Sequence, residues 1–343
     1  MLKVTLLGTG GTQPLPERAL AAAAVSVGGH NILLDCGEGT QVGLRRYGVS
    51  AYRLSAVLLT HYHGDHILGL PGLLQTLGSL NRTEPLTIYG PRGIEAVSRA
   101  IMALAGPQAY PVRWQQADAP FTVNELQITP FPLTHRVPCC GYALALPRAG
   151  KFDPARARAA GIPIEYWGTL QKGETVGGFT PEQVLGAPRR GLKVVYATDS
   201  RPCPAIVDAA RDADLLCMDA TYADDADLDK AKLYGHATCR ETGETAAAAQ
   251  VRRLWLTTRP GGSGKTAVLR YGDPQVEQRI DLRKNADYDI DTGLYTIHLH
   301  VENGGIAFVN SPCPDHLCEG FGTLKNEGDW AACMPAKASL TIE

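Results

Sequence analysis

Four residues with metal-binding side chains lie within one six-residue segment. They are His61, His63, Asp65 and His66. The apolar run 56–59 precedes them and predicts a buried strand that ends just before the first histidine. Imidazole and carboxylate groups are ligands that suit Zn²⁺. Alternate side chains of a short loop point in different directions. We therefore expect the first two histidines to face one metal ion, and the aspartate and last histidine to face a second.

Length and composition place the chain among ordinary globular proteins. It has 343 residues, enough for one large domain and a small one, with 44% hydrophobic and 20% charged residues. The formal net charge of −2 means that nucleic-acid binding requires a local basic patch. We expect no signal peptide, because the apolar stretch at the N-terminus is too short. We expect no membrane helix, because no apolar run approaches about 20 residues. Nine cysteines, an odd number, argue against a complete disulfide framework, so we expect a cytoplasmic protein.

Further polar residues stand at the ends of predicted elements. Asp199 and Asp219 follow the predicted strands 193–197 and 214–218. At Asp199, a carboxylate at a strand end can bridge two metal ions, because each oxygen can serve one ion. His236 precedes a helix whose start is marked by the capping-box pattern from Thr238 to Glu241. His135 also follows a predicted strand, but taken alone such a histidine is more often packed or exposed than metal-bound.

Residues 148–191 differ from their surroundings in charge. Seven basic residues are spread among glycines and prolines there, and Tyr166 and Trp167 interrupt them. This pattern fits a solvated insertion. It also fits a protruding arm that holds phosphate groups electrostatically and offers an aromatic side chain for stacking.

The pattern of the first segment, HxHxDH, resembles the metallo-β-lactamase superfamily. This implies an α/β fold, the αββα sandwich with metal ions at one edge. Over about residues 1–258 the chain further resembles the ribonuclease Z family of tRNA 3′-processing endonucleases, including that family's exosite arm at 148–191. The motifs that carry this resemblance are Leu7-Gly8-Thr9-Gly10, Asp35-Cys36-Gly37-Glu38, the segment 61–66 with Leu70-Pro71-Gly72-Leu73-Leu74, His135 with Gly141-Tyr142, Gly161-Ile162-Pro163 with 170–176, Asp199-Ser200-Arg201-Pro202, Asp219-Ala220-Thr221-Tyr222 and Gly235-His236-Ala237-Thr238.

The resemblance implies a zinc-dependent endoribonuclease, with precursor tRNA as its partner and a homodimer as its assembly. Its products would be a tRNA with a free 3′-OH and a trailer with a 5′-phosphate. The implied ligands are His61, His63 and His135 for the first of two Zn²⁺ ions, Asp65 and His66 for the second, and Asp199 between them. The implied catalytic residues are Asp65, which orients or deprotonates the water, His236, which protonates the leaving oxygen, and Asp219, which fixes the tautomer of that histidine.

Three positions depart from the family pattern. Asp219 stands where the family usually has glutamate, and Ile164-Glu165-Tyr166 replaces a Gly-Pro pair in the arm. Thr258 stands where the family's last strand ends in a metal-ligand histidine. The second metal would lose one protein ligand, so we expect reduced activity.

The C-terminal part is predicted to form a separate, small β-rich module. Residues 259–265 have the composition of a linker, and 266–343 resemble NusG domain II. His298 and His300 alternate with apolar residues on the solvent face of a predicted hairpin, so we do not expect them to bind metal. Three cysteines predict a disulfide plus a free thiol, or no chemical role; zinc is less favoured because their spacing is not CxxC. They are Cys313, Cys318 and Cys333.

Two other functions compete with the nuclease. A related metallohydrolase could act on small phosphodiesters or sulfate esters, but such a substrate needs no basic arm. A degenerate nuclease domain could bind tRNA without cutting it, because its metal site is incomplete. A metal count together with a cleavage assay on precursor tRNA separates the three.

Restoring the missing ligand tests this alignment. Imidazole is a far better neutral zinc ligand than a threonine hydroxyl. We expect Thr258→His to raise metal affinity and to raise the cleavage rate at limiting zinc, measured by chelator competition and precursor tRNA cleavage. His63→Ala should abolish cleavage in either background. The alignment of this strand is wrong if the wild type already cleaves precursor tRNA efficiently and Thr258→His changes neither metal affinity nor cleavage rate.

Overall fold

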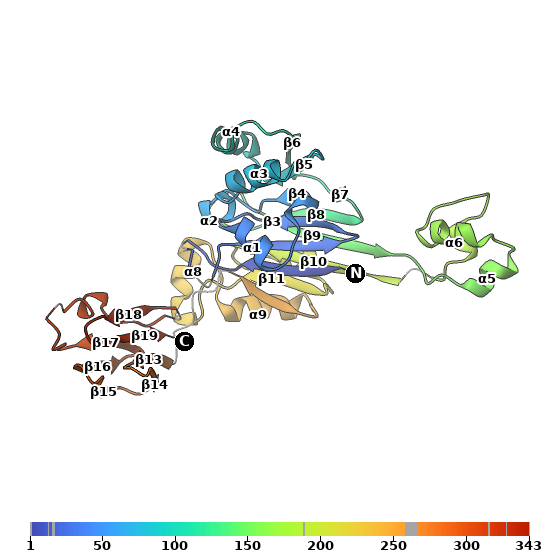
Figure 1. Cartoon of the computed structure of the whole chain (residues 1–343). Coiled ribbons are helices and arrows are strands. Elements are labelled where there is room, and N and C mark those ends of the chain that lie inside the picture. The colour runs from blue at the N-terminus through green and yellow to red at the C-terminus, as the bar shows by residue number, and fades with distance from the viewer. Residues whose placement is uncertain are drawn as a thin grey trace. The chain divides into compact units, whose positions relative to one another are not determined.

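The computed structural model describes residues 2–12, 14–15, 18–187, 189–257, 266–314, 316–326 and 328–342. The chain divides into two compact units, residues 1–259 and 260–343 (Figure 1). Thr258 and the predicted linker 259–265 lie outside the described residues, so the expectations about them stay predictions.

The first sheet of the first unit has six strands in sequence order. The first three pair antiparallel, and the third to the sixth pair parallel. Gly28 and Gly29 join the second and third strands with positive φ, which glycine adopts without a steric penalty. The strands are β1 (Lys3–Gly8), β2 (Ala22–Val27), β3 (His30–Leu34), β4 (Leu54–Leu58), β5 (Leu86–Gly90) and β6 (Val112–Gln116).

The second sheet also has six strands, in the order β12-β11-β10-β9-β8-β7. The strands from β7 to β10 pair antiparallel, and those from β10 to β12 pair parallel. The parallel register aligns Ala197 with Met218 and Asp219 with Thr257, so the carboxyl ends of three strands share one edge. The strands are β7 (Phe121–Val123), β8 (Leu126–Pro132), β9 (Cys140–Arg148), β10 (Arg189–Ala197), β11 (Leu215–Asp219) and β12 (Leu254–Thr257).

Helices cover the outer faces of both sheets. One apolar cluster joins the first sheet to α1, α3 and α4, a second lies between the sheets, and a third joins the second sheet to α7 and α9. Four layers result, which confirms the predicted αββα sandwich (Figure 1). The helices of these layers and the site are α1 (Thr40–Arg46), α2 (Gly64–Ile67), α3 (Leu70–Ser79), α4 (Ile94–Ala105), α7 (Pro204–Ala210), α8 (Leu228–Tyr234) and α9 (Cys239–Ala248), with 3₁₀ turns at Ala51–Arg53 and Asp225–Asp227.

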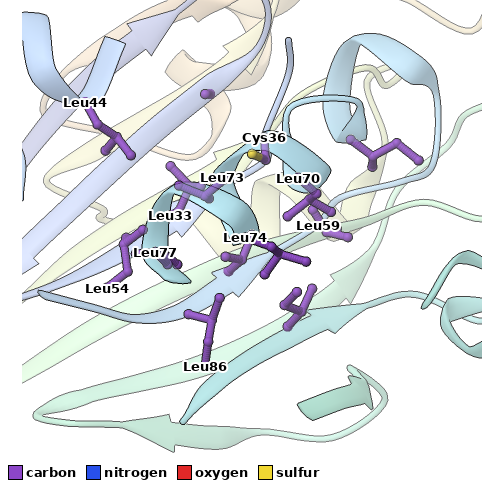
Figure 2. Close-up of a cluster of buried hydrophobic side chains, with 14 of the residues drawn as sticks. Leu33, Cys36, Leu44, Leu54, Leu59, Leu70, Leu73, Leu74, Leu77 and Leu86 are labelled. Carbon is purple, nitrogen blue, oxygen red and sulfur yellow. The ribbon is translucent and has the colours of Figure 1, made fainter. Parts of the chain in front are cut away.

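The first cluster anchors the helix that follows the metal-binding segment. Leucines on one side of α3 pack against Leu33 of β3 and against Leu59, which directly follows β4 (Figure 2). Cys36 is fully buried in the same cluster, and burial raises the pKa of its thiol to about 12. That thiol is therefore a packed, unreactive group.

The segment between β9 and β10 carries α5 (Pro154–Ala159), α6 (Ile164–Gln171) and a 3₁₀ turn (Pro181–Gln183), which lie beyond the ends of these strands (Figure 1). It has a small apolar core of its own, which includes Leu170. Trp167 Nε1 donates to the carbonyl of Ile162 at 3.0 Å, and the Arg158 guanidinium lies 5.7 Å from the Trp167 ring centre. Tyr166 is likewise half-buried and lies beside Phe179. Both aromatic side chains therefore have packing partners within the arm.

The C-terminal unit contains two antiparallel sheets, ordered β14-β13-β19-β18 and β15-β16-β17, around one apolar core. His298 and His300 face solvent on β16 and pair with Asp289 and Asp287 of the neighbouring strand. The elements are β13 (Thr266–Tyr271), β14 (Val276–Asp281), β15 (Ala286–Asp291), β16 (Thr296–Glu302), β17 (Gly305–Val309), β18 (Trp330–Cys333) and β19 (Ala338–Ile342), with a 3₁₀ turn at Glu319–Phe321.

Candidate metal centre

Three histidines and one aspartate converge where the two sheets meet. Ligand atoms of His61, His63, His135 and Asp199 all lie within 4.8 Å of one another. His63 Nδ1 is 3.0 Å from His61 Nε2 and 3.4 Å from His135 Nε2. A tetrahedral zinc ion with bonds of about 2.0–2.1 Å separates its ligand atoms by about 3.3 Å. The spacing therefore suits one metal ion, held by residues from both sheets.

A second group lies beside the first and shares Asp199 with it. It consists of Asp65, His66 and Asp199. His66 Nε2 lies 3.4 Å from Asp199 Oδ2 and 3.9 Å from Asp65 Oδ2. This nitrogen is buried and makes no hydrogen bond of good geometry among the described residues. Such an atom costs about 1–3 kcal/mol unless something satisfies it, and a metal ion would. The donor set thus fits two cations with one shared carboxylate.

The second ring nitrogen of each of three histidines is fixed by a hydrogen bond, which sets the tautomer and aims Nε2 into the centre. Residues outside the predicted site supply these acceptors. His61 Nδ1 donates to Thr60 Oγ1 at 3.0 Å, His66 Nδ1 to Asp35 Oδ2 at 2.9 Å, and His135 Nδ1 to the Gly235 carbonyl at 3.0 Å. Sequence reasoning placed Asp35 in a structural motif but gave it no link to a ligand.

The charges of the first group match those of metal ligands, whereas in the second group Asp199 and Asp35 outweigh burial and raise the pKa of His66. Burial lowers the pKa of His61 to about 2, and burial also lowers the pKa values of His63 and His135. These imidazoles are therefore neutral at pH 7. Burial opposes ionisation of Asp199, but His66 and His61 outweigh it and lower the pKa of that carboxyl. Neutral imidazoles and ionised carboxylates are the states that bind metal.

The turn after β1 holds Asp65. The backbone N–H of Thr12 donates to Asp65 Oδ2 at 2.9 Å. The turn requires glycine at position 8, because a Cβ there would lie 2.0 Å from the Leu20 carbonyl oxygen. This glycine-rich turn, which lacks the features of a P-loop, therefore positions the side chain of a candidate ligand.

His236 and Asp219 form a pair next to Asp199. His236 Nδ1 lies 2.9 Å from Asp219 Oδ2, so the shorter acid does reach the histidine. Burial opposes protonation of His236, but Asp219 outweighs it and raises the pKa of the imidazole. Asp219 is fully buried, and the N–H of Thr221 fixes its other oxygen at 2.8 Å. The capping box of Thr238 and Glu241 begins α9 just beyond, as the sequence predicts.

Arg201 links the Asp199 and His236 loops, and sequence reasoning missed this. Its Nη1 donates to the His236 carbonyl at 2.7 Å, and its guanidinium also pairs with Glu241. The signal available in the sequence was its place in the Asp199-Ser200-Arg201-Pro202 motif.

The comparisons agree with this geometry. The family model described as the beta-lactamase superfamily domain matches residues 30–257, and that of NusG domain II matches 246–343. Ribonuclease Z of Agathobacter rectalis is 43% identical over 264 residues, covering 75% of this chain and 87% of that protein. Ribonuclease Z of Lachnoclostridium phytofermentans is 41% identical with the same coverage. The crystal structure of the short form of human tRNase Z is 27% identical with a TM-score of 0.56, covering 76% of this chain and 93% of that one.

The fold and the cluster of ligands define a metallo-β-lactamase-type hydrolase. Within that superfamily, the identity to these relatives shows that the chain belongs to the ribonuclease Z family, and its C-terminal part matches NusG domain II. Among the residues that the structure describes, no helix is long and apolar enough to cross a bilayer.

Neutralising Asp35 should weaken metal binding. Asp35→Asn keeps the side-chain size but replaces a carboxylate that accepts from His66 and Thr60. Loss of such a partner typically lowers metal affinity 10–100-fold. Chelator competition on the full chain measures this. Asp214→Asn, which also removes a carboxylate that accepts from a backbone N–H, is the matched control and should leave affinity unchanged. Equal affinity of both variants would show that the Asp35 contact does not support the centre.

Proposed function

We propose that the chain is a zinc-dependent endoribonuclease that removes the 3′ trailer of precursor tRNA. It would leave a 3′-OH on the tRNA and a 5′-phosphate on the trailer. The convergence of six metal-ligating residues with the His236–Asp219 pair carries this proposal. The names of the relatives, ribonuclease Z and tRNase Z, support the choice of substrate.

Six residues would hold the metal ions. His61, His63 and His135 serve the first ion, Asp65 and His66 serve the second, and Asp199 lies between the groups, since both contain it. When bound, two zinc ions supply an activated water and neutralise charge that develops on the phosphate.

The protein's own groups then position the water and the leaving oxygen. Thr12 holds Asp65 through one carboxylate oxygen, and this carboxylate orients the attacking water and accepts its proton. Asp219 binds Nδ1 of His236, which leaves the Nε2 proton for transfer to the departing 3′ oxygen. Arg201 holds the backbone of the histidine in place for this transfer.

The arm would bind tRNA phosphates. Its seven basic side chains are all exposed, against four acidic residues in the same segment. Its aromatic side chains are engaged in packing, so charge rather than base stacking is the recognition that this segment offers.

Cleavage of precursor tRNA by the zinc-loaded chain tests the function. We expect end-group analysis of the products to show a 3′-OH and a 5′-phosphate. His63→Ala should abolish cleavage and lower the metal content. His236→Ala should lower the rate by about 10²–10⁴-fold with unchanged metal content, because a positioned general acid contributes that much.

His300→Ala, in the C-terminal unit, is the matched control and should cleave normally. Hydrolysis of small phosphodiesters without tRNA cleavage would instead favour the small-substrate hydrolase. Tight tRNA binding without cleavage of either substrate would favour the binding protein, for which the Thr258 departure is the motivating observation.

Charge reversal in the arm tests its role. We expect the double variant Lys151→Glu/Lys172→Glu to raise KM for precursor tRNA and to weaken its salt dependence, because two phosphate contacts are lost. Hydrolysis of a small phosphodiester should be unchanged. Lys284→Glu, an exposed lysine of the C-terminal unit, is the control. A parallel loss on both substrates would contradict the arm assignment.

The homodimer and the cytoplasmic location belong to the same proposal. Light scattering on the purified chain measures the first, and fractionation of cells measures the second. A monomer at working concentration would contradict the assembly expected from the family.

A further inference from the structure

Three cysteines of the C-terminal unit, far apart in sequence, meet in its core. Cys313 and Cys318 lie in the segment that follows β17, and Cys333 ends β18. Their sulfur atoms lie within 4.8 Å of one another. All three side chains are buried, with at most 2% exposed, in the apolar cluster that also contains Leu299 and Phe308.

The sulfur spacing distinguishes two kinds of chemistry. Cys313 Sγ and Cys333 Sγ are 3.7 Å apart. A disulfide bond is about 2.05 Å long. Two thiolates on one metal ion with bonds of about 2.3 Å are separated by about 3.8–4.0 Å in tetrahedral or trigonal geometry. The observed separation is too long for a disulfide bond; it is that of a thiol–thiol hydrogen bond and lies close to that of two ligands of a common ion. The third sulfur lies within 4.8 Å of both.

We propose that Cys313, Cys318 and Cys333 form a binding site for a soft, thiophilic metal ion, Zn²⁺ or Cu⁺. Thiolates select such ions, whereas the nuclease centre offers only nitrogen and oxygen ligands. Binding forms three metal–sulfur bonds and releases three thiol protons to solvent, with no change of oxidation state. The ion would tie the segment 313–318 to the end of β18.

The sequence disfavoured this site because its spacing lacks a CxxC pair. Four residues separate the first two cysteines, and fourteen separate the second from the third. The segment after β17 turns back through the 3₁₀ turn Glu319–Phe321, and an isolated bridge pairs Leu324 with Ile306 of β17. This path brings all three sulfurs together without local CxxC spacing. Ser311 Oγ, 2.9 Å from Cys318 Sγ, provides a neighbouring polar group.

Cobalt substitution on the full, reduced chain tests the proposal. Thiolate-to-Co²⁺ charge transfer absorbs in the near ultraviolet, and only sulfur ligands produce it. We expect metal-free chain titrated with Co²⁺ to develop this band, and His63→Ala, which impairs the nuclease centre, to retain it. Cys333→Ser should lower the affinity of the site at least tenfold. Cys217→Ser, an equally buried cysteine of the nuclease unit, should behave as wild type.

Two measurements on the wild type do not depend on the folding of any variant. Alkylation of the denatured chain without reductant should modify all nine thiols. Seven thiols with a disulfide mapped among these three cysteines would overturn the proposal. Absence of the charge-transfer band from a chain with nine free thiols, together with equal Cu⁺ binding by the wild type and the Cys333→Ser variant, would overturn it equally. The difference in metal content between the wild type and the Cys333→Ser variant, both as purified, identifies the ion.

Discussion

The buried carboxylate of Asp35 ties together the elements that form the metal centre. It accepts hydrogen bonds from the Thr60 N–H at 2.7 Å, from the Thr60 hydroxyl, and from His66 Nδ1. Thr198, which precedes Asp199 in the other sheet, also approaches it at 3.4 Å. A buried charge is stable only when its lone pairs are satisfied, so these partners have little freedom to move. The end of β3, the ligand loop after β4 and the end of β10 are therefore held in one arrangement.

Backbone conformation reinforces this arrangement. Asp35 and Asp199 each follow a strand and have positive φ, 55° and 48°. Aspartate tolerates this conformation better than most residues, but it still costs roughly 1–3 kcal/mol. Each residue leaves its strand abruptly, and both carboxylates contact His66. The hydrogen bonds of the centre and the sheet pairings on either side hold both residues in this conformation.

Local patterns predicted much of this centre, and long-range contacts account for the rest. The dense segment 61–66 and the capping box at Thr238 are complete within a few residues, so their chemistry could be read directly. The contact of Arg201 with the His236 carbonyl joins two loops that only tertiary folding brings together. Trp167 illustrates the opposite case: an aromatic residue among basic ones suggested stacking on a base, but the arm uses it for its own small core. The cysteines of the C-terminal unit were judged by spacing, whereas the path of the chain between them decides their proximity.

One consequence follows from the origin of the ligands in both sheets. His61, His63 and His66 follow a strand of the first sheet, and His135 and Asp199 follow strands of the second. An ion bound there braces the two halves of the sandwich, and it binds the folded state alone. At a free concentration one hundred times its dissociation constant, such a ligand adds about 2.7 kcal/mol to the free energy of unfolding. Metal supply would then govern how long the protein survives proteolysis as well as its catalytic rate. A metal-starved cell would hold fewer copies of it.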